Sequence, residues 1–485
     1  MRLLWVVAVS LLACCGRSSG PREAAGSAGS ASASGSASAP GSASAAADPW
    51  AASTAPRPPD TPEAQQRRAE AALGRVATIE PEVAKLRGLA FERAVPTRYQ
   101  PPDEFRAFVR REIAKELPAA RSRDLTAALA HLGFLTAPDD LATVEEQAMT
   151  TQAGAYYDPA AKAFFVVMVP DSDLMLDTMS AHELTHALQD QHFDLAKFLP
   201  SDRSLSDDAA SARRFVAEGD ATLVMLLYAA RSQIGAALSP ALIAALRAQV
   251  TALASQDITA LKSQVKSQAQ LFHGVDREIQ KSIDAMDAIP PAVLVPLLDA
   301  YTKGALVALT AYEHGGWPAV DALYRDPPAS TEQVLHPATK LYPVRDRPHR
   351  VRLPASGDHE LVSDVIGELL WKVYFGLWKS PRAAEAAEGW GGDRYAVARR
   401  SDGRLIGRIA TVWDTPDDAA QFADAFVASL AARFPGADVR QPASGVVRPG
   451  GGRVFVRRAG ARVFIVDGAD NASALDALAR GARFE

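Results

Sequence analysis

The sequence predicts a predominantly helical α+β protein, and three features of its 485 residues lead to this expectation. Helical patterns occupy most of residues 62–324, including Ala-rich runs such as PALIAALRAQVTALA. A short β-hairpin interrupts them at 153–170, where aromatic and β-branched runs flank DPAAK. After residue 351, hairpins and helices alternate in a ββα-ββα order.

Composition and charge narrow the class of protein. The chain is 48% hydrophobic and 22% charged, which is typical of a globular protein, and its length exceeds that of one ordinary core. We therefore expect at least two folded units. The net charge is −5 and no Lys/Arg-rich run occurs, so nucleic acid is not an expected partner.

The first 13 residues are expected to be a signal peptide. Arg2 supplies positive charge, Leu3 to Ala13 form a short apolar run, and LLAC ends in Cys14. This ending resembles a bacterial lipobox, in which the cysteine is lipidated and everything before it is removed; an ordinary secretory signal is the alternative. Residues 14–60 are then a lipidated cysteine and a flexible Gly/Ser/Ala/Pro tether. The expected location is the bacterial cell envelope, lipid-anchored to a membrane and facing the periplasm or the exterior.

Cysteine usage limits the chemistry of the folded part. Cys14 and Cys15 are the only cysteines, so the body has no disulfide, no catalytic thiol and no cysteine-ligated metal. Any metal site must use His, Asp or Glu.

The stretch HELTHALQDQHF carries the strongest functional signal, on an expected helix that follows the hairpin. His182 and His186 are four apart and share one helical face, so both can bind one ion, and Glu183 lies close enough to address a water there. Apolar residues are expected on the opposite, packed face: Ala181, Leu184, Leu188 and Leu195. The alternative is a polar patch on a surface helix.

A second helix, expected over Arg213 to Ala230, favours the metal site. It is apolar almost all round, yet it carries Glu218 and Asp220, and a buried unpaired carboxylate costs several kcal/mol. Glu218 as a third ligand would meet that requirement, and two His with one Glu leave a zinc position open for water. Asp220 points about 200° away on a straight helix and is expected to be a structural or outer acid. The alternative is a loop at Gly219.

These motifs carry a resemblance. HELTH, followed 32 residues after its second histidine by a helix-borne glutamate, resembles a gluzincin-type zinc metallopeptidase. Together with AEGDATL, GGW, PPASTEQVLHP and GWGGDRY, it is similar to a group of exported bacterial proteins described as metallopeptidases or lipoproteins, over roughly residues 85–430. The resemblance implies a zincin-like metallopeptidase domain at 61–348 (β-hairpin, HExxH helix, second ligand helix), followed by an α+β module at 349–485. It implies that His182, His186 and Glu218 bind Zn²⁺ and that Glu183 is the general base.

Other residues have open assignments. His336 ends a short helix with Ser330 and Gln333 as a capping box, which is a structural interpretation; the catalytic alternative is a donor to an oxyanion at the metal. Asp190 is expected to be an exposed helix acid, or else a partner of a ligand imidazole. In GWGGDRY the glycines suggest a tight turn, and Trp390 a core or groove contact. The remaining histidines are expected to face solvent or to be satisfied where they lie.

The expected function is a membrane-tethered zinc metallopeptidase that hydrolyses peptide bonds of a peptide or protein substrate, with Glu183 activating a zinc-bound water. The alternative is a catalytically inactive or non-proteolytic envelope lipoprotein that uses the same scaffold to bind a partner. The sequence does not indicate an oligomeric state.

Overall fold

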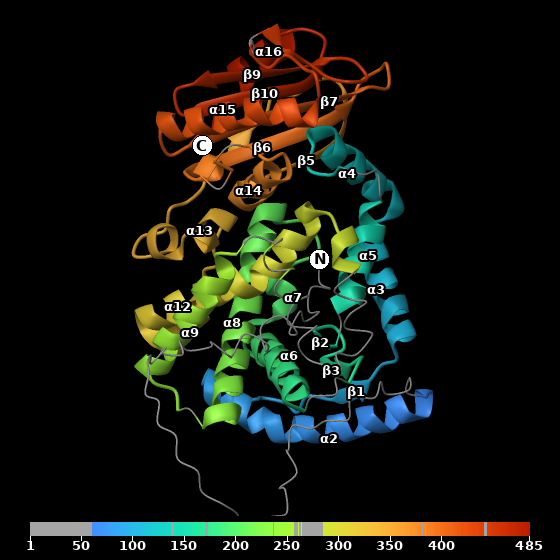
Figure 1. The fold of residues 1–485 in the computed structure, drawn as a ribbon, viewed down its shortest axis with the longest axis vertical. Helices are drawn as coiled ribbons and strands as arrows, with labels where there is room; N and C mark the ends of the chain where they lie inside the picture. Colours follow the sequence, from blue (N-terminus) through green and yellow to red (C-terminus); the bar gives the residue numbers. More distant parts are fainter. Residues whose placement is uncertain are drawn as a thin grey trace, which may run out of the picture.

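A computed structural model describes residues 61–136, 140–152, 154–169, 173–235, 237–256, 260, 263, 285–380, 382–383, 385–440 and 444–485. The predicted signal peptide, Cys14 and the tether to residue 60 lie outside the described residues. Within them the fold is α+β, as predicted, with a helical body and a six-stranded sheet stacked along the long axis of the molecule (Figure 1).

The helical body begins with a long helix, α2 (Pro62–Arg87), that crosses under the others (Figure 1). Thr61 caps its first turn, and Gly88 ends it in the left-handed conformation. The other helices of the body are α3 (Pro102–Glu116), α4 (Ala119–Leu132), α5 (Leu141–Gln152), α6 (Asp173–Phe193), α7 (Leu195–Phe198), α8 (Asp207–Ile234), α9 (Pro240–Ala254), α12 (Pro291–Arg325) and α13 (Thr331–Leu335).

The predicted hairpin is present and belongs to a three-stranded sheet. Strands β2 (Ala155–Asp158) and β3 (Ala163–Val166) pair antiparallel, and β1 (Thr97–Tyr99) adds to β3 in parallel. The strand order β1-β3-β2 leaves β2 at the edge nearest α6. The hairpin therefore leads the chain directly to the helix that carries HELTH.

Helices α8 and α12 cross in direct backbone contact. A Cβ atom at Gly219 would lie 2.0 Å from the carbonyl oxygen of Gly304, and one at Gly304 would lie 2.5 Å from that of Phe215. Only glycines allow this approach. The alternative of a loop at Gly219 is therefore wrong: α8 runs unbroken through this residue, because the glycine serves packing between helices.

The C-terminal part is built on a sheet of order β5-β6-β7-β10-β9-β8. The predicted ββα-ββα order is present in its two hairpins and two helices. The elements are β4 (Val351–Arg352), β5 (His359–Asp364), α14 (Gly367–Leu377), β6 (Trp390–Arg399), β7 (Leu405–Trp413), α15 (Pro416–Arg433), β8 (Val446–Val447), β9 (Arg453–Ala459), β10 (Arg462–Ala469), α16 (Ser473–Gly481) and β11 (Arg483–Phe484).

The turn suggested by the glycines of GWGGDRY is present only at Gly389, whose φ is 76°, whereas the residues from Trp390 onward begin strand β6. Trp390 is buried, and the pairing register with β7 shifts between Trp390 and Gly392. The indole nitrogen of Trp390 donates to Asp393 at 2.8 Å, and that carboxylate also accepts from Trp371 and from two backbone N–H groups. Asp393 of this motif thus accepts four buried hydrogen bonds within the core.

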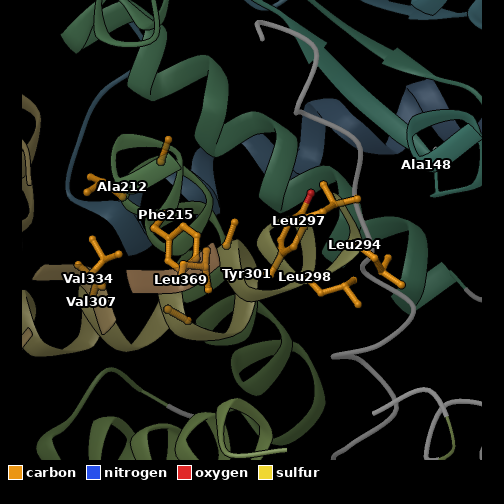
Figure 2. Close-up of a cluster of buried hydrophobic side chains, with 14 of the residues drawn as sticks. Ala148, Ala212, Phe215, Leu294, Leu297, Leu298, Tyr301, Val307, Val334 and Leu369 are labelled. Carbon is orange, nitrogen blue, oxygen red and sulfur yellow. The ribbon is translucent and has the colours of Figure 1, made fainter. Parts of the chain in front are cut away.

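The two parts share one continuous hydrophobic core. Leu369 of α14 packs among side chains of α8, α12 and α13, including Phe215, Leu297 and Val334 (Figure 2). A second, smaller cluster lies under α16. Strand β4, the first strand of the C-terminal part, begins at Val351, close to the predicted boundary between residues 348 and 349. The first helix of this part, α14, packs into the helical body.

Candidate metal centre

Helix α6 places the HELTH residues in the interior of the protein. His182, Glu183 and His186 have no exposed surface, and every residue from Thr178 to Asp190 is buried. The helix packs against α2, α8 and β2. Ala181, Leu184 and Leu188 pack as predicted, and the ligand side of the helix is buried as well. Leu195 lies beyond the end of α6, in α7.

The three predicted ligands converge on one point. His182 Nε2 lies 3.1 Å from Glu218 Oε2, His186 Nε2 lies 3.1 Å from His182 Nε2, and His186 Nε2 lies 3.5 Å from Glu218 Oε2. A circle through three such points has a radius of about 1.9 Å, close to the ~2.0–2.1 Å of Zn–N and Zn–O bonds, so an ion slightly above their plane would reach all three.

The hydrogen bonding of the same atoms also fits a cation. Gln189 Oε1 lies 2.8 Å from His186 Nδ1, while the amide nitrogen of Gln189 donates to Ala217 O at 2.9 Å and to Asp220 Oδ2 at 3.2 Å. Since Gln189 can only accept from the imidazole, Nδ1 of His186 carries the proton and its Nε2 presents a lone pair. Lone pairs of His186 and Glu218 then face each other, which a bound cation would stabilise.

Burial controls the protonation of the cluster. Loss of solvent lowers the pKa of His182 to about 4 and that of His186 to about 3, so both imidazoles are neutral at pH 7 and able to bind a metal. Burial raises the pKa of Glu218, and one of its oxygens, Oε1, has no hydrogen-bond partner among the described residues. A positive ion at the cluster would offset both desolvation costs.

Glu183 lies beside the cluster but is not one of its three members. Its Oε2 accepts from the backbone N–H of Tyr157 in β2 at 2.9 Å, whereas Oε1 is buried without a hydrogen-bond partner among the described residues. Burial, and then the charge of Glu218, raise the pKa of Glu183 well above its usual range. One oxygen is thus held in place and the other is left for a proton, the arrangement that a general base requires.

A buried chain of polar groups supports His186 from behind. Asp220, which accepts from Gln189, forms an ion pair with Arg87 Nε at 2.8 Å, and neither side chain is exposed. Tyr324 donates to Asp220 at 2.9 Å, and Arg87 also binds Asp321 at 2.7 Å. The expected outer role of Asp220 agrees with these contacts. Such partners fix the ring orientation of a metal-binding histidine.

Both assignments considered for Asp190 are wrong. It is buried rather than exposed, and its carboxylate accepts from Tyr157 Oη at 2.8 Å and pairs with Lys162 at 2.8 Å. It therefore ties the β2–β3 hairpin to α6. The partner of the ligand imidazole is the neighbouring Gln189 instead.

His336 lies outside the cluster. Ser330 caps α13 by accepting from Gln333 N at 3.4 Å, but the Gln333 side chain accepts from Ala329 N, so the reciprocal half of the expected capping box is absent. His336 Nε2 lies 2.8 Å from Glu368 of α14. No contact recorded among the described residues links His336 to the metal ligands, so these contacts support the structural interpretation.

The sequence interpretation missed Tyr301, Gln189 and Arg87. The Tyr301 ring, in α12, lies 5.7 Å from the His182 ring, and the negative charges of Glu218 and Glu183 add to burial in raising its pKa. Gln189 could have been found, because it follows His186 by three residues on the same helical face. Tyr301 and Arg87 could not, since they lie more than 80 residues from the nearest ligand in the chain.

Comparisons with known proteins bear only on the C-terminal part. A family described as a domain of unknown function (DUF8575) matches residues 352–479, a range that contains none of the cluster residues. No curated protein and no solved structure matches the chain.

Proposed function

We propose that the protein is a zinc-dependent metallopeptidase in which His182, His186 and Glu218 hold the ion. The observation that carries this proposal is the convergence of their three ligand atoms, at 3.1, 3.1 and 3.5 Å from one another, on two buried helices. The β2–β3 hairpin, α6 and α8 follow in the order of a zincin-like core, which supports the same conclusion.

The roles of the residues follow from their positions. When bound, zinc supplies a Lewis acid and a water of lowered pKa. Glu183 would take a proton from the attacking water through its unpaired oxygen, Oε1, and pass it to the leaving amine. Gln189 and Asp220 keep the His186 ring in the tautomer that presents Nε2. Tyr301, whose ring lies 5.7 Å from that of His182, would be the donor to the oxygen of the scissile carbonyl.

One observation favours the second candidate, a non-proteolytic lipoprotein that binds a partner. His182 and His186 have no exposed surface and Glu218 is 1% exposed, so a polypeptide needs an opening to reach them. None of the three lines the cavities of about 260 and 200 Å³ in the described part of the protein. Metal content and turnover together distinguish the two functions.

The full chain is expected to hold one zinc ion. His182→Ala combined with His186→Ala should abolish it, because two of three ligands are lost. Elemental analysis of wild type and variant checks this. His192→Ala, which changes another histidine of the same helix, is the control and should keep its zinc. Stoichiometric zinc in the double variant would place the metal elsewhere.

We further propose that Cys14 is lipidated and anchors the protein to a membrane. Cys14→Ser should move the exported protein from the membrane fraction to the soluble fraction, and Cys15→Ser should not. Fractionation followed by immunoblotting measures both. Among the described residues, α12 alone is long and apolar enough to cross a membrane, but 61% of its most apolar stretch is buried inside the protein, so we interpret it as a core helix. Wild-type protein found chiefly in the soluble fraction would contradict the anchor.

A further inference from the structure

A cavity of about 260 Å³ is lined by residues of α4, α5, α8, α12 and α14, among others. Arg214, which lines it, precedes Glu218 by four residues on α8; Leu297, which also lines it, precedes Tyr301 by four residues on α12. Figure 2 shows Leu297 and Tyr301 side by side. Residues four apart share a helical face and lie roughly 6 Å apart along the axis, so the cavity begins one turn from the metal ligands.

The unpaired polar atoms of this cavity are mainly donors. Arg121 has two buried guanidinium nitrogens, Nε and Nη2, without an acceptor among the described residues, and Arg214 has one, Nε. Among acceptors, one carboxylate oxygen of Glu145, Oε2, has no hydrogen-bond partner among the described residues. Burial raises the pKa of Glu145 to about 7, so this group is partly protonated at neutral pH and competes weakly for the guanidinium groups. The charge of Arg214 is already opposed by Glu218, Glu116 and Asp207. Buried donors without acceptors are costly, so the Arg121 guanidinium is the group that an anionic ligand would satisfy.

The remaining walls are mostly apolar, but Glu116, Asp207 and Asp208 also line the cavity. Asp208 accepts hydrogen bonds from Thr331, and burial raises its pKa to about 8, so it is largely neutral. Leu125, Leu297 and Leu369 come from three different helices and give the cavity an aliphatic lining. A ligand that fits must therefore combine a carboxylate-like group with a hydrocarbon side chain. The C-terminal residue of a peptide has this chemistry whatever its sequence, whereas an internal segment has it only where an Asp or Glu side chain lies beside an aliphatic one.

We propose that this cavity binds the C-terminal end of a peptide, with the terminal carboxylate on Arg121 and Arg214 and an aliphatic side chain against the leucines. The proposal rests on the proposed peptidase function and makes the enzyme a carboxypeptidase. One residue of extended chain spans ~3.5 Å, so the roughly 6 Å from the cavity to the ligands corresponds to one or two C-terminal residues.

The reaction is a simple hydrolysis. The oxygen of water bonds to the carbonyl carbon, the C–N bond breaks, and the water proton taken by Glu183 passes to the departing nitrogen. The products are a shortened peptide with a new carboxylate and a free amino acid or dipeptide. No oxidant, reductant or second substrate is required.

The test compares N-acetyl-Ala-Ala-Leu with the same peptide as its C-terminal amide, using the zinc-loaded full chain. We expect kcat/KM for the free acid to exceed that for the amide by about 10- to 100-fold, the effect of hydrogen bonds to a charged group. Mass spectrometry of the products shows whether one or two residues leave. Equal rates for acid and amide, or a faster amide, would overturn the proposal while leaving the peptidase function intact.

Variants of Arg121 test whether this residue causes the preference for the free acid. Arg121→Gln should reduce the preference for the acid towards unity, and Arg121→Lys should restore part of it. Arg123→Gln, which changes an exposed arginine on the same helix, is the matched control and should keep the preference. Melting temperature and zinc content are measured for each protein. An unchanged preference in folded, zinc-loaded Arg121→Gln contradicts the assignment of this cavity.

A binding measurement separates this inference from the proposed function. If neither peptide is hydrolysed, titration calorimetry with N-acetyl-leucine and N-acetyl-leucinamide decides, because binding in the cavity needs no turnover. Tighter binding of the acid to wild type, lost in Arg121→Gln, supports the cavity and contradicts the peptidase. No preference between the two ligands contradicts the cavity.

Discussion

Glu183→Gln is expected to remove nearly all peptide hydrolysis while the zinc ion stays bound. Glu183 is not one of the three converging ligands, so its neutral amide should leave the metal and the fold in place. Loss of a general base typically lowers the rate by about 10²- to 10⁴-fold. Zinc content, melting temperature and kcat for a C-terminally free peptide are the measurements.

Glu218→Gln is expected to differ from Glu183→Gln in its zinc content. It removes a charged ligand from a site where the carboxylate is 1% exposed, so zinc affinity should fall together with activity. Glu104→Gln, at an exposed position on α3, is the control for the loss of one negative charge. Activity of Glu183→Gln equal to that of wild type would show that another group is the base. Equal loss of zinc in both variants would show that Glu183 is itself a ligand.

Asp220→Ala is expected to cost about 3 kcal/mol of stability, because it removes one partner of a buried charge. Arg87 would keep Asp321, at 2.7 Å, but its Nε would lose the carboxylate that now lies 2.8 Å away. Tyr324 and Gln189 would lose an acceptor in the same interior. Urea unfolding of the zinc-free protein measures the change without a contribution from the metal.

The same variant is expected to weaken zinc binding by about 10- to 100-fold, since Gln189 would no longer hold the His186 ring as firmly. The control is Asp326→Ala, which breaks the ion pair with Arg345 at 3.0 Å, where Asp326 is 63% exposed. Solvent screens that pair, so its loss should cost less than about 1 kcal/mol and leave zinc binding unchanged. Similar urea midpoints and zinc affinities for Asp220→Ala and Asp326→Ala would contradict the role assigned to the Arg87–Asp220 pair.

The local order of elements followed from the sequence because it depends on short-range patterns. The hairpin before HELTH, helix α6 and the two C-terminal hairpins each have a repeat of hydrophobic residues that one segment displays by itself. The cluster of His182, His186 and Glu218 was also predicted from patterns within single helices. Two histidines four apart define a face, and an acid in an apolar helix requires a cation.

The features that the sequence analysis did not predict depend on contacts between segments far apart in the chain. The burial of the ligand side of α6 was not predicted, because it depends on packing against α2, α8 and β2, and the periodicity within α6 carries no information on these segments. Asp190 was misplaced for the same reason, because Lys162 and Tyr157 reach it from the hairpin.

The sequence by itself determined the fold class, the order of elements and the identity of the candidate ligands, since residue type and spacing are sufficient for these. The tertiary structure alone decided that the three ligand atoms meet and that Arg87 supports them through Asp220 and Gln189. It also decided that Arg214, one helical turn before Glu218 on α8, lines a cavity together with Arg121. The physical reason is that burial and ion pairing depend on distances between segments that are far apart in the chain, here brought together by the glycine contact between α8 and α12.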